Sequence, residues 1–260
     1  MDLNLTGRSV LITGGSKGIG FGVARWFAKE GCNLRLAARS QTELEAAKAK
    51  LEQIAKIDVR TYAMDLSISE SRDKLTAACS DVDILINNAG GVPGGSIEDI
   101  DDAKWRAAWD LKVFGYINMS RAFYTLMKAR KSGVIINIIG VGGERLDSGY
   151  IAGATGNAAL IAFTKTLGST SIDEGVRVLG VNPGPVATER LEFLARKRAL
   201  DRFGDAERWR EFFKSMPLGR AATVDETAAS VVFLASDLSA YTSGVMLNID
   251  GGLVSRGALP

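Results

Sequence analysis

The chain has 260 residues, enough for one large α/β domain or two small ones, and its 46% hydrophobic and 24% charged residues are ordinary for a globular protein. The formal net charge of +2 at pH 7 gives no sign of nucleic-acid binding. Histidine is absent, which excludes a Ser-His-Asp triad and an imidazole general base and removes the usual ligand of most zinc sites, so we expect no metal.

Apolar runs typical of strands alternate with helix-like runs along the whole chain. The predicted strands are 10–13, 33–38, 59–63, 83–87, 133–139, 176–182 and 245–249, and the predicted helices are 21–29, 43–55, 67–79, 103–130, 150–167, 189–214 and 224–234. Runs such as Ile84-Leu85-Ile86 are apolar on both faces, which is typical of a parallel sheet covered by helices on each side. Repeated β-α units therefore predict a single domain, residues 1–260, with a doubly wound parallel sheet of the Rossmann type.

A glycine-rich turn follows the first predicted strand. Residues 13–20 read Thr-Gly-Gly-Ser-Lys-Gly-Ile-Gly and open the first helix-like run. Glycines let the backbone approach a ligand closely, and the N–H groups at the start of a helix attract an anion. The motif alone is weak, but the strand before it and the helix after it predict nucleotide binding.

Small, turn-forming or polar residues also follow the other predicted strands. In a doubly wound sheet the ligand lies beyond the carboxyl ends of the strands, so these residues are the candidates for function. They are residues 13–20, 38–40, 65–66, 87–90, 140–143 and 182–184. Turn formation alone explains one or two such strand ends but explains six poorly.

These strand ends resemble the short-chain dehydrogenase/reductase family over nearly the whole chain. The resemblance rests on residues 13–20, Asp65-Leu66, Asn87-Asn88-Ala89-Gly90, Asn182-Pro183-Gly184 with Thr188, and Asp250-Gly251-Gly252. It implies hydride transfer between a nicotinamide cofactor and a carbonyl or enoyl carbon of a small-molecule substrate. The implied cofactor-binding residues are Gly14, Ser16, Lys17, Gly18, Ile19 and Gly20 in the loop, Asp65 and Leu66 at the adenine, Asn88, Ala89 and Gly90 at the adenosine ribose, and Pro183, Gly184, Val186 and Thr188 at the nicotinamide.

The end of the second predicted strand bears on the choice of cofactor. An acidic residue there would bond the ribose 2′-OH of NAD, but this chain has Ala38-Arg39-Ser40. Arg39 can grip a 2′-phosphate with paired donors, and Lys17 adds a second positive charge. We predict NADP, with NAD as the alternative if both cations merely face solvent.

The family's usual catalytic groups are missing from this sequence. Members of the family carry a Ser after the fifth strand, a Tyr-x-x-x-Lys on the next helix and an Asn on the preceding helix. Matching the flanking runs places Gly140 at the Ser, Gly153 at the Tyr, Asn157 at the Lys and Asp110 at the Asn. Four substitutions together predict a change in chemistry.

Tyr150 is the main candidate for a catalytic residue in place of the missing groups. It lies seven residues before Asn157, and seven helical steps of about 700° would place both side chains on one helix face. Tyr150 could be a displaced proton donor or oxyanion-stabilising group, with Ser148, Asp110 and Asp147 as weaker candidates, while Asn157 could bond a ribose hydroxyl. The alternative is that Tyr150 packs at the surface where the helix begins.

Gly153 and Gly156 stand inside the same predicted helix, where each glycine costs about 1 kcal/mol relative to alanine. Such positions are expected where backbone approaches cofactor or ligand, or where a second subunit packs, and both interpretations stay open. The resemblance implies a homodimer or homotetramer.

Residues 188–217 correspond to the segment that folds over the substrate in the family. Its cations are Arg190, Arg196, Lys197, Arg198, Arg202, Arg208, Arg210 and Lys214, with aromatic residues between them. Either these charges face water, or one arginine binds an acidic group of the substrate, such as a carboxylate, a phosphate or a coenzyme A thioester. The sequence does not choose the arginine.

No apolar stretch approaches the about 20 residues that span a bilayer, and the N-terminus lacks a basic and apolar leader. Cys32 and Cys79 have neither metal nor disulfide spacing. We predict a cytoplasmic protein with no membrane or nucleic-acid partner. The favoured function is an oxidoreductase with a non-standard active site. The alternatives are a catalytically impaired nucleotide-binding member with a binding or regulatory role, and a pocket with non-redox chemistry.

Overall fold

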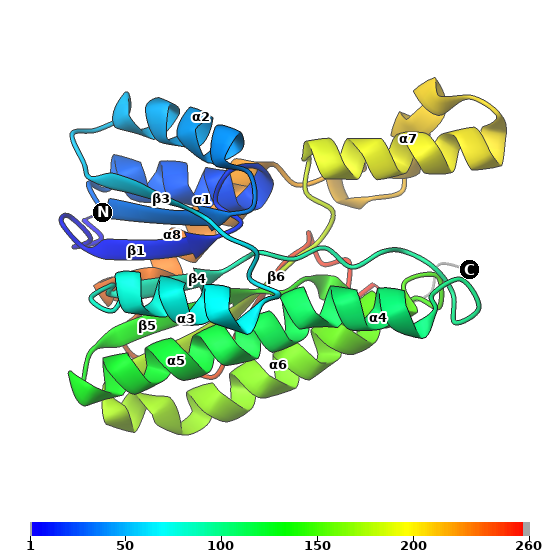
Figure 1. The fold of residues 1–260 in the computed structure, drawn as a ribbon. Coiled ribbons are helices and arrows are strands. Elements are labelled where there is room, and N and C mark those ends of the chain that lie inside the picture. The colour runs from blue at the N-terminus through cyan, green and yellow to red at the C-terminus, as the bar shows by residue number, and fades with distance from the viewer. Residues whose placement is uncertain (1, 257–260) are drawn as a thin grey trace.

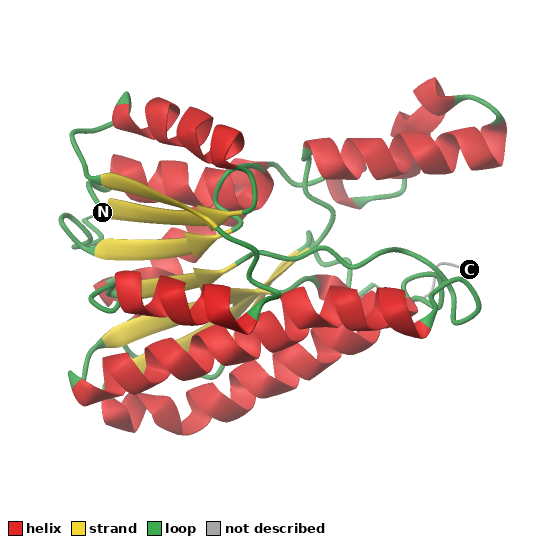
Figure 2. Ribbon diagram, viewed as in Figure 1, coloured by secondary structure: helices red, strands yellow, loops and turns green. Residues whose placement is uncertain are grey.

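The computed structural model describes residues 2–256. Seven parallel strands form one sheet in the order β3-β2-β1-β4-β5-β6-β7, and helices pack on both of its faces (Figures 1 and 2). The strands are β1 (Ser9–Thr13), β2 (Asn33–Ala38), β3 (Val59–Ala63), β4 (Ile84–Asn87), β5 (Gly133–Ile138), β6 (Val176–Pro183) and β7 (Met246–Ile249). The α-helices are α1 (Gly18–Lys29), α2 (Gln41–Glu52), α3 (Ser69–Ala78), α4 (Asp102–Trp109), α5 (Gly115–Ala129), α6 (Ile151–Ser171), α7 (Glu189–Phe203) and α8 (Val224–Ala235). The predicted doubly wound α/β domain is confirmed.

The central strand β1 shows why apolar runs build this sheet. Val10 and Ile12 point to one face and pack in a cluster with Phe27 of α1. Leu11 points to the other face and packs in a second cluster with Phe123 of α5. Because successive strand residues alternate between faces, a strand covered by helices on both sides must be apolar throughout.

Two of the predicted helices are interrupted. The predicted helix 103–130 contains a π-helical segment, η1 (Asp110–Phe114), between α4 and α5. The predicted helix 189–214 ends earlier, because Gly204 takes a left-handed conformation with φ 70° and caps α7. A 3₁₀ segment, η4 (Ala206–Phe213), follows and folds back on α7.

Helix α7 and η4 together form a hairpin that stands beyond the carboxyl edge of the sheet (Figure 1). Aromatic side chains hold this hairpin together. Phe203 stacks on Phe212 with ring centroids 5.5 Å apart, and Trp209 meets Phe213 edge-on at 5.4 Å. The hairpin therefore has a small apolar cluster of its own.

Candidate active site

A cleft of about 1520 Å³ opens at the carboxyl ends of the strands. It is bounded by the start of α1, the segments that follow β5 and β6, and the α7–η4 hairpin. The predicted site residues that line it are Ile19, Gly140, Tyr150, Asn157, Pro183, Gly184, Val186 and Thr188, with the weaker candidates Asp147 and Ser148. The fold thus brings together segments that lie far apart in the sequence.

The glycine loop is held in shape by the end of β4. The Asn88 Nδ2 donates to the carbonyl oxygens of Thr13 and Gly14 at 3.0 and 3.1 Å. The Thr13 hydroxyl accepts from the backbone N–H groups of Asn88 and Ala89. A Cβ at Gly20 would overlap the Gly14 carbonyl oxygen, so the loop closes on α1 only with glycine there. The Asn88 amide nitrogen and the backbone N–H groups of Asn88 and Ala89 are therefore all engaged with the loop, which gives this stretch a structural role.

The two cations predicted at the 2′-phosphate differ in their surroundings. The Lys17 Nζ lies 2.8 Å from the Glu43 carboxylate, which also accepts from the Ser16 hydroxyl. The hydrogen bond from Lys17 is the main cause that lowers the pKa of Glu43. Arg39 is exposed and has no ion-pair partner among residues 2–256. Of the two cations, Arg39 is therefore the one that is not engaged in an ion pair within residues 2–256.

The residues predicted at the adenine have partly structural roles. Asp65 accepts hydrogen bonds from the backbone N–H and the hydroxyl of Ser67, and these bonds lower the pKa of the Asp65 carboxyl. Leu66 is 4% exposed and packs in the core. Its carbonyl oxygen accepts a hydrogen bond from the Arg72 Nη1 at 2.8 Å, so the backbone of Leu66 is also partly engaged.

Backbone of β6 and the start of α7 close the predicted nicotinamide end. The Gly184 N–H donates to the Ile249 carbonyl of β7 at 3.0 Å. The Thr188 hydroxyl caps α7 by accepting from the Leu191 N–H, and its methyl group lies 3.7 Å from the Cβ position of Gly18. Thr188 thus packs close to the start of α1 at one side of the cleft.

Tyr150 lies at the N-cap of α6 with φ −137° and ψ 36°, outside the helix. The prediction that Tyr150 and Asn157 share a helix face through regular helical spacing is therefore wrong. The Tyr150 ring instead folds back over the helix, and a Cβ at Gly153 would overlap its Cζ. The ring packs in a cluster with Val92 and Ala152. Gly153 thus makes room for an aromatic ring of the same chain.

The phenol of Tyr150 borders the cleft. Within the described part of the chain, its hydroxyl has no hydrogen-bond partner. Burial is the main cause that raises its pKa, and the positive charge of Arg190 acts in the opposite direction. A Cβ at Gly142 would meet the Tyr150 Cε1 at 3.3 Å and the Asn157 Nδ2 at 3.3 Å. Tyr150 and Asn157 therefore approach the same short stretch of backbone.

Asn157 is 3% exposed, and its Nδ2 donates to the Gly140 carbonyl at 3.4 Å. Its Oδ1 is buried without a partner among the described residues. Gly140 has φ 125°, a backbone conformation that residues with a side chain rarely adopt. A serine is therefore disfavoured at position 140 for a steric reason, while Asn157 holds an unused acceptor beside the cleft.

Two further predicted positions lie away from the cleft. Asp110 is exposed at the start of η1 and does not line the cleft. Gly156 faces Trp109 and Val113, and a Cβ there would lie 3.1 Å from the indole nitrogen and 3.0 Å from a Val113 methyl group. The close approach inferred from Gly156 is thus an internal packing contact.

Sequence reasoning missed Lys112. Its Nζ donates to the Ile139 carbonyl at 2.7 Å, directly before Gly140. Burial, with a smaller contribution from Arg190, lowers the pKa of Lys112 to about 8. The side chain reaches this position from η1, and no helical periodicity in the sequence signals a π-helical segment. A lysine in an otherwise apolar stretch, Leu111 to Phe114, was the signal available.

Some arginines of the α7–η4 hairpin form ion pairs with glutamates, and others line the cleft together with arginines from elsewhere in the chain. Arg196 pairs with Glu192 and Glu207, and Arg208 pairs with Glu211. The arginines that line the cleft are Arg145, Arg190, Arg198, Arg202 and Arg256, against the acidic residues Asp147 and Glu211. The cleft is therefore positively charged.

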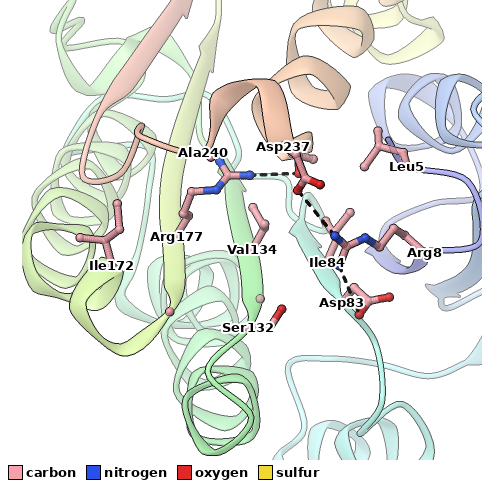
Figure 3. Close-up of a pocket in the computed structure, with 13 residues that line it drawn as sticks. Leu5, Arg8, Asp83, Ile84, Ser132, Val134, Ile172, Arg177, Asp237 and Ala240 are labelled. Atoms are coloured by element: carbon pink, nitrogen blue, oxygen red, sulfur yellow. Dashed lines mark hydrogen bonds and ion pairs between the residues drawn. The ribbon is translucent and has the colours of Figure 1, made fainter. Parts of the chain in front are cut away.

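A second pocket, of about 230 Å³, lies at the opposite, amino-terminal edge of the sheet (Figure 3). Arg8 pairs there with Asp83 at 4.0 Å and with Asp237 at 3.5 Å. Arg177 donates to three successive carbonyl groups at the end of α8. Arg8 thus balances two carboxylates, and Arg177 caps the C-terminal end of α8. Both roles are structural.

Within residues 2–256, no group of His, Cys, Asp and Glu side chains could hold a metal ion. In the same part of the chain, no helix is both long and apolar enough to cross a membrane.

Comparison with known proteins agrees with this geometry. The family model described as short chain dehydrogenase matches residues 8–199. The 3-oxoacyl-(acyl-carrier-protein) reductase of Chlamydia muridarum is 29% identical, covering 97% of this chain and 100% of the relative. Oxidoreductase UcpA of Salmonella typhimurium is 36% identical, covering 95% of each.

Solved structures show the same likeness. The L-sorbose reductase of Gluconobacter frateurii, complexed with NADPH and L-sorbose, has a TM-score of 0.91 and 30% identity, covering 99% of this chain and 100% of that one. An NAD⁺-bound xylitol dehydrogenase has a TM-score of 0.88 and 25% identity, and the match covers 96% of this chain and 100% of that one. The chain belongs to the short-chain dehydrogenase family.

Proposed function

We propose that this oxidoreductase is an NADP-dependent reductase of carbonyl or enoyl groups, with Tyr150 as its proton donor in a non-standard active site. One observation carries the proposal: the Tyr150 phenol and the buried Asn157 Oδ1 border the same cleft, and neither has a hydrogen-bond partner among residues 2–256. The family's usual Ser, Tyr and Lys are replaced in this proposal by Gly140, Gly153 and Asn157.

The cleft fits a nicotinamide cofactor. The Asn157 Oδ1 can accept from a ribose hydroxyl, which would satisfy a buried acceptor that otherwise costs free energy. Gly20 permits the close backbone of the loop, and the start of α1 offers its N–H groups to a diphosphate. A bound nicotinamide supplies the hydride. The nicotinamide end of the cofactor would be bordered by Pro183, Gly184, Val186 and Thr188. Its adenine end would be bordered by Asp65 and Leu66.

Tyr150 is suited to giving a proton rather than taking one. Burial raises its pKa, so its hydroxyl stays protonated at neutral pH. During reduction the O–H donates its proton to the substrate oxygen as negative charge develops there, and the phenolate regains a proton from solvent in the cleft. The positive charge of Arg190 opposes the effect of burial and stabilises the transient phenolate. These features favour the reductive direction.

NADP preference rests on Arg39. This guanidinium is exposed at the end of β2, and paired donors suit a phosphate. Lys17 forms an ion pair with Glu43, so it would contribute to binding of the 2′-phosphate only if the phosphate replaced Glu43 as its partner. NAD remains the alternative cofactor.

Three broader features complete the proposal. Residues 188–217 act as a lid over the substrate, since the α7–η4 hairpin supplies one wall of the cleft. The substrate is a small molecule with an acidic group, because the cleft is lined by five arginines and two acidic residues. The protein is cytoplasmic and forms a homodimer or homotetramer, as the family resemblance implies.

A binding role without turnover is the second candidate. It is favoured by Gly140, whose φ of 125° suits glycine and disfavours serine, so that no hydroxyl stands at this position to orient a substrate. This candidate and the reductase make the same prediction for cofactor binding but opposite predictions for turnover.

The test uses the purified protein with NADPH or NADH. Fluorescence titration measures the dissociation constant of each, and absorbance at the nicotinamide band measures consumption with a panel of ketones, oxo acids and enoyl thioesters. Tighter binding of NADPH with steady turnover supports the reductase. Tight binding without turnover on the whole panel supports the binding role, and tighter binding of NADH contradicts the NADP proposal.

A further inference from the structure

Two cationic side chains rest against a pair of consecutive glycines after β4. A Cβ at Gly90 would lie 3.0 to 3.1 Å from the Cβ, Cγ and Cδ atoms of Lys112. A Cβ at Gly91 would lie 2.5 Å from the Arg190 Nη1. Consecutive Cα atoms are about 3.8 Å apart, so one bare stretch of backbone makes room for both cations.

The two cations are held by carbonyl groups. The Lys112 Nζ donates to the Ile139 carbonyl at 2.7 Å, and the Arg190 Nη2 donates to the Val92 carbonyl at 3.2 Å. Neither has an ion-pair partner among the described residues, 2–256. Arg196, on the same helix as Arg190, shows the contrast, since it pairs with Glu192 and Glu207.

Arg190 is exposed and Lys112 is half-buried, and the charge of Arg190 makes it harder for Lys112 to carry its own positive charge. The lowered pKa of Lys112 reflects both burial and the nearby charge of Arg190. An anion placed between the two would remove the repulsion and add charge-assisted hydrogen bonds. Within residues 2–256 no carboxylate forms an ion pair with either cation, so both charges are available to an anionic ligand.

The site borders the proposed chemistry. Val92, whose carbonyl holds Arg190, packs in the same cluster as the Tyr150 ring. Ile139, whose carbonyl holds Lys112, directly precedes Gly140, and both line the cleft. Arg190 also acts on the pKa of Tyr150 through its charge. An anionic group held here would lie beside the phenol.

We propose that Arg190 and Lys112 form a binding site for the carboxylate of the substrate, which makes an oxo acid the substrate class. This inference rests on the proposed reductase function for the identity of the reacting group. The carboxylate would orient the neighbouring carbonyl toward the Tyr150 hydroxyl. Arg190 offers paired donors and Lys112 a point charge, a combination that suits a planar carboxylate.

The probes are two acids and their neutral esters: pyruvate with methyl pyruvate, and acetoacetate with methyl acetoacetate. Thermal melting at constant ionic strength, with and without NADPH, measures binding independently of turnover. NADPH consumption with each acid and ester gives the ratio of kcat/KM values. The variants are Arg190→Gln, Arg190→Lys and Lys112→Met, and Arg196→Gln is the matched control on the same helix.

At least one acid should stabilise the wild type more than its ester. Loss of a charge-assisted contact should weaken binding of that acid by about 10- to 100-fold in Arg190→Gln and Lys112→Met. Arg190→Lys should keep part of the effect, and Arg196→Gln should keep all of it. The apo melting curves show whether each variant is folded, and Arg190→Lys keeps the test valid if Arg190→Gln is not.

Three results would overturn the inference: equal responses to every acid and its ester, equal losses in Arg190→Gln and Arg196→Gln, or variants that weaken NADPH binding while the acids bind as before. The last result would assign the cations to the cofactor diphosphate. If an acid binds through Arg190 but no carbonyl compound is reduced, the site stands and the proposed reductase function fails.

Discussion

Replacement of Gly153 by alanine tests the placement of the Tyr150 ring. Inside a helix this change normally stabilises a protein, because alanine has a higher helix propensity than glycine by about 1 kcal/mol. Here the added methyl group would overlap the Tyr150 Cζ. Moving the ring aside would give up its packing against Val92, Ile100 and Ala152. We expect Gly153→Ala to destabilise the protein.

The magnitude follows from two opposing contributions. Extra atoms in a packed cluster typically cost about 1–3 kcal/mol, and the gain in helix propensity offsets about 1 kcal/mol of this. The net loss should therefore be at most about 2 kcal/mol, and close to zero if the steric cost is at the low end. In a Tyr150→Ala background the ring is gone, so Gly153→Ala should stabilise by up to about 1 kcal/mol. The two changes should therefore be coupled by about 1–3 kcal/mol, which is the steric cost itself.

Urea unfolding followed by circular dichroism measures the free energy of unfolding of the wild type, both single variants and the double variant. These four proteins form a double-mutant cycle, so the effect of Tyr150→Ala alone cancels from the coupling free energy. If Gly153→Ala stabilises both backgrounds equally, the ring does not occupy this space. The same geometry means that a tyrosine at 153 with a lysine at 157 could raise carbonyl reduction only after Tyr150 is replaced by a small residue.

Three further predictions concern single side chains. Arg39→Ala should weaken NADPH binding by about 10-fold or more and change NADH binding little, because only NADPH carries the 2′-phosphate; equal losses in a fluorescence titration would refute this. Lys112→Met should raise the free energy of unfolding at pH 7 by up to about 3 kcal/mol, because the pKa of this lysine falls from 10.5 to about 8 on folding. The cost of the buried charge is present below pH 8 and is relieved between about pH 8 and the unfolded value, so the gain should shrink as the pH rises through this range; a gain that is constant with pH would contradict it. Gly140→Ser should destabilise by about 1–3 kcal/mol in thermal or urea unfolding, because φ 125° strains a residue with a side chain, and an unchanged stability would show that the backbone relaxes.

The fold and the cofactor side of the cleft follow from local patterns. Apolar runs such as Val10 to Ile12 fix a strand buried on both faces, and the edge where parallel strands end fixes where loops gather. The expectation that Ile19, Gly140 and Gly184 gather at one edge of the sheet follows from this rule, and all three line the cleft.

Contacts between distant or irregular segments could not be predicted in the same way. Tyr150 lies outside α6 because its backbone is not helical, yet its ring returns over Gly153. The position of the Lys112 side chain depends on η1. Arg190 follows β6 and Gly91 follows β4, and the two meet only because both strands end at the same edge of the sheet. Each of these positions is set by tertiary packing, which leaves little trace in sequence periodicity.

The effect of Tyr150→Phe on NADPH-dependent reduction tests the central claim most directly. The measurement compares kcat and the NADPH dissociation constant of wild type and variant, using the best carbonyl substrate found. Removal of the phenolic proton should lower kcat by about 10²- to 10⁴-fold while NADPH binds as in the wild type. A variant that keeps the wild-type kcat across the pH range would show that Tyr150 is not the proton donor.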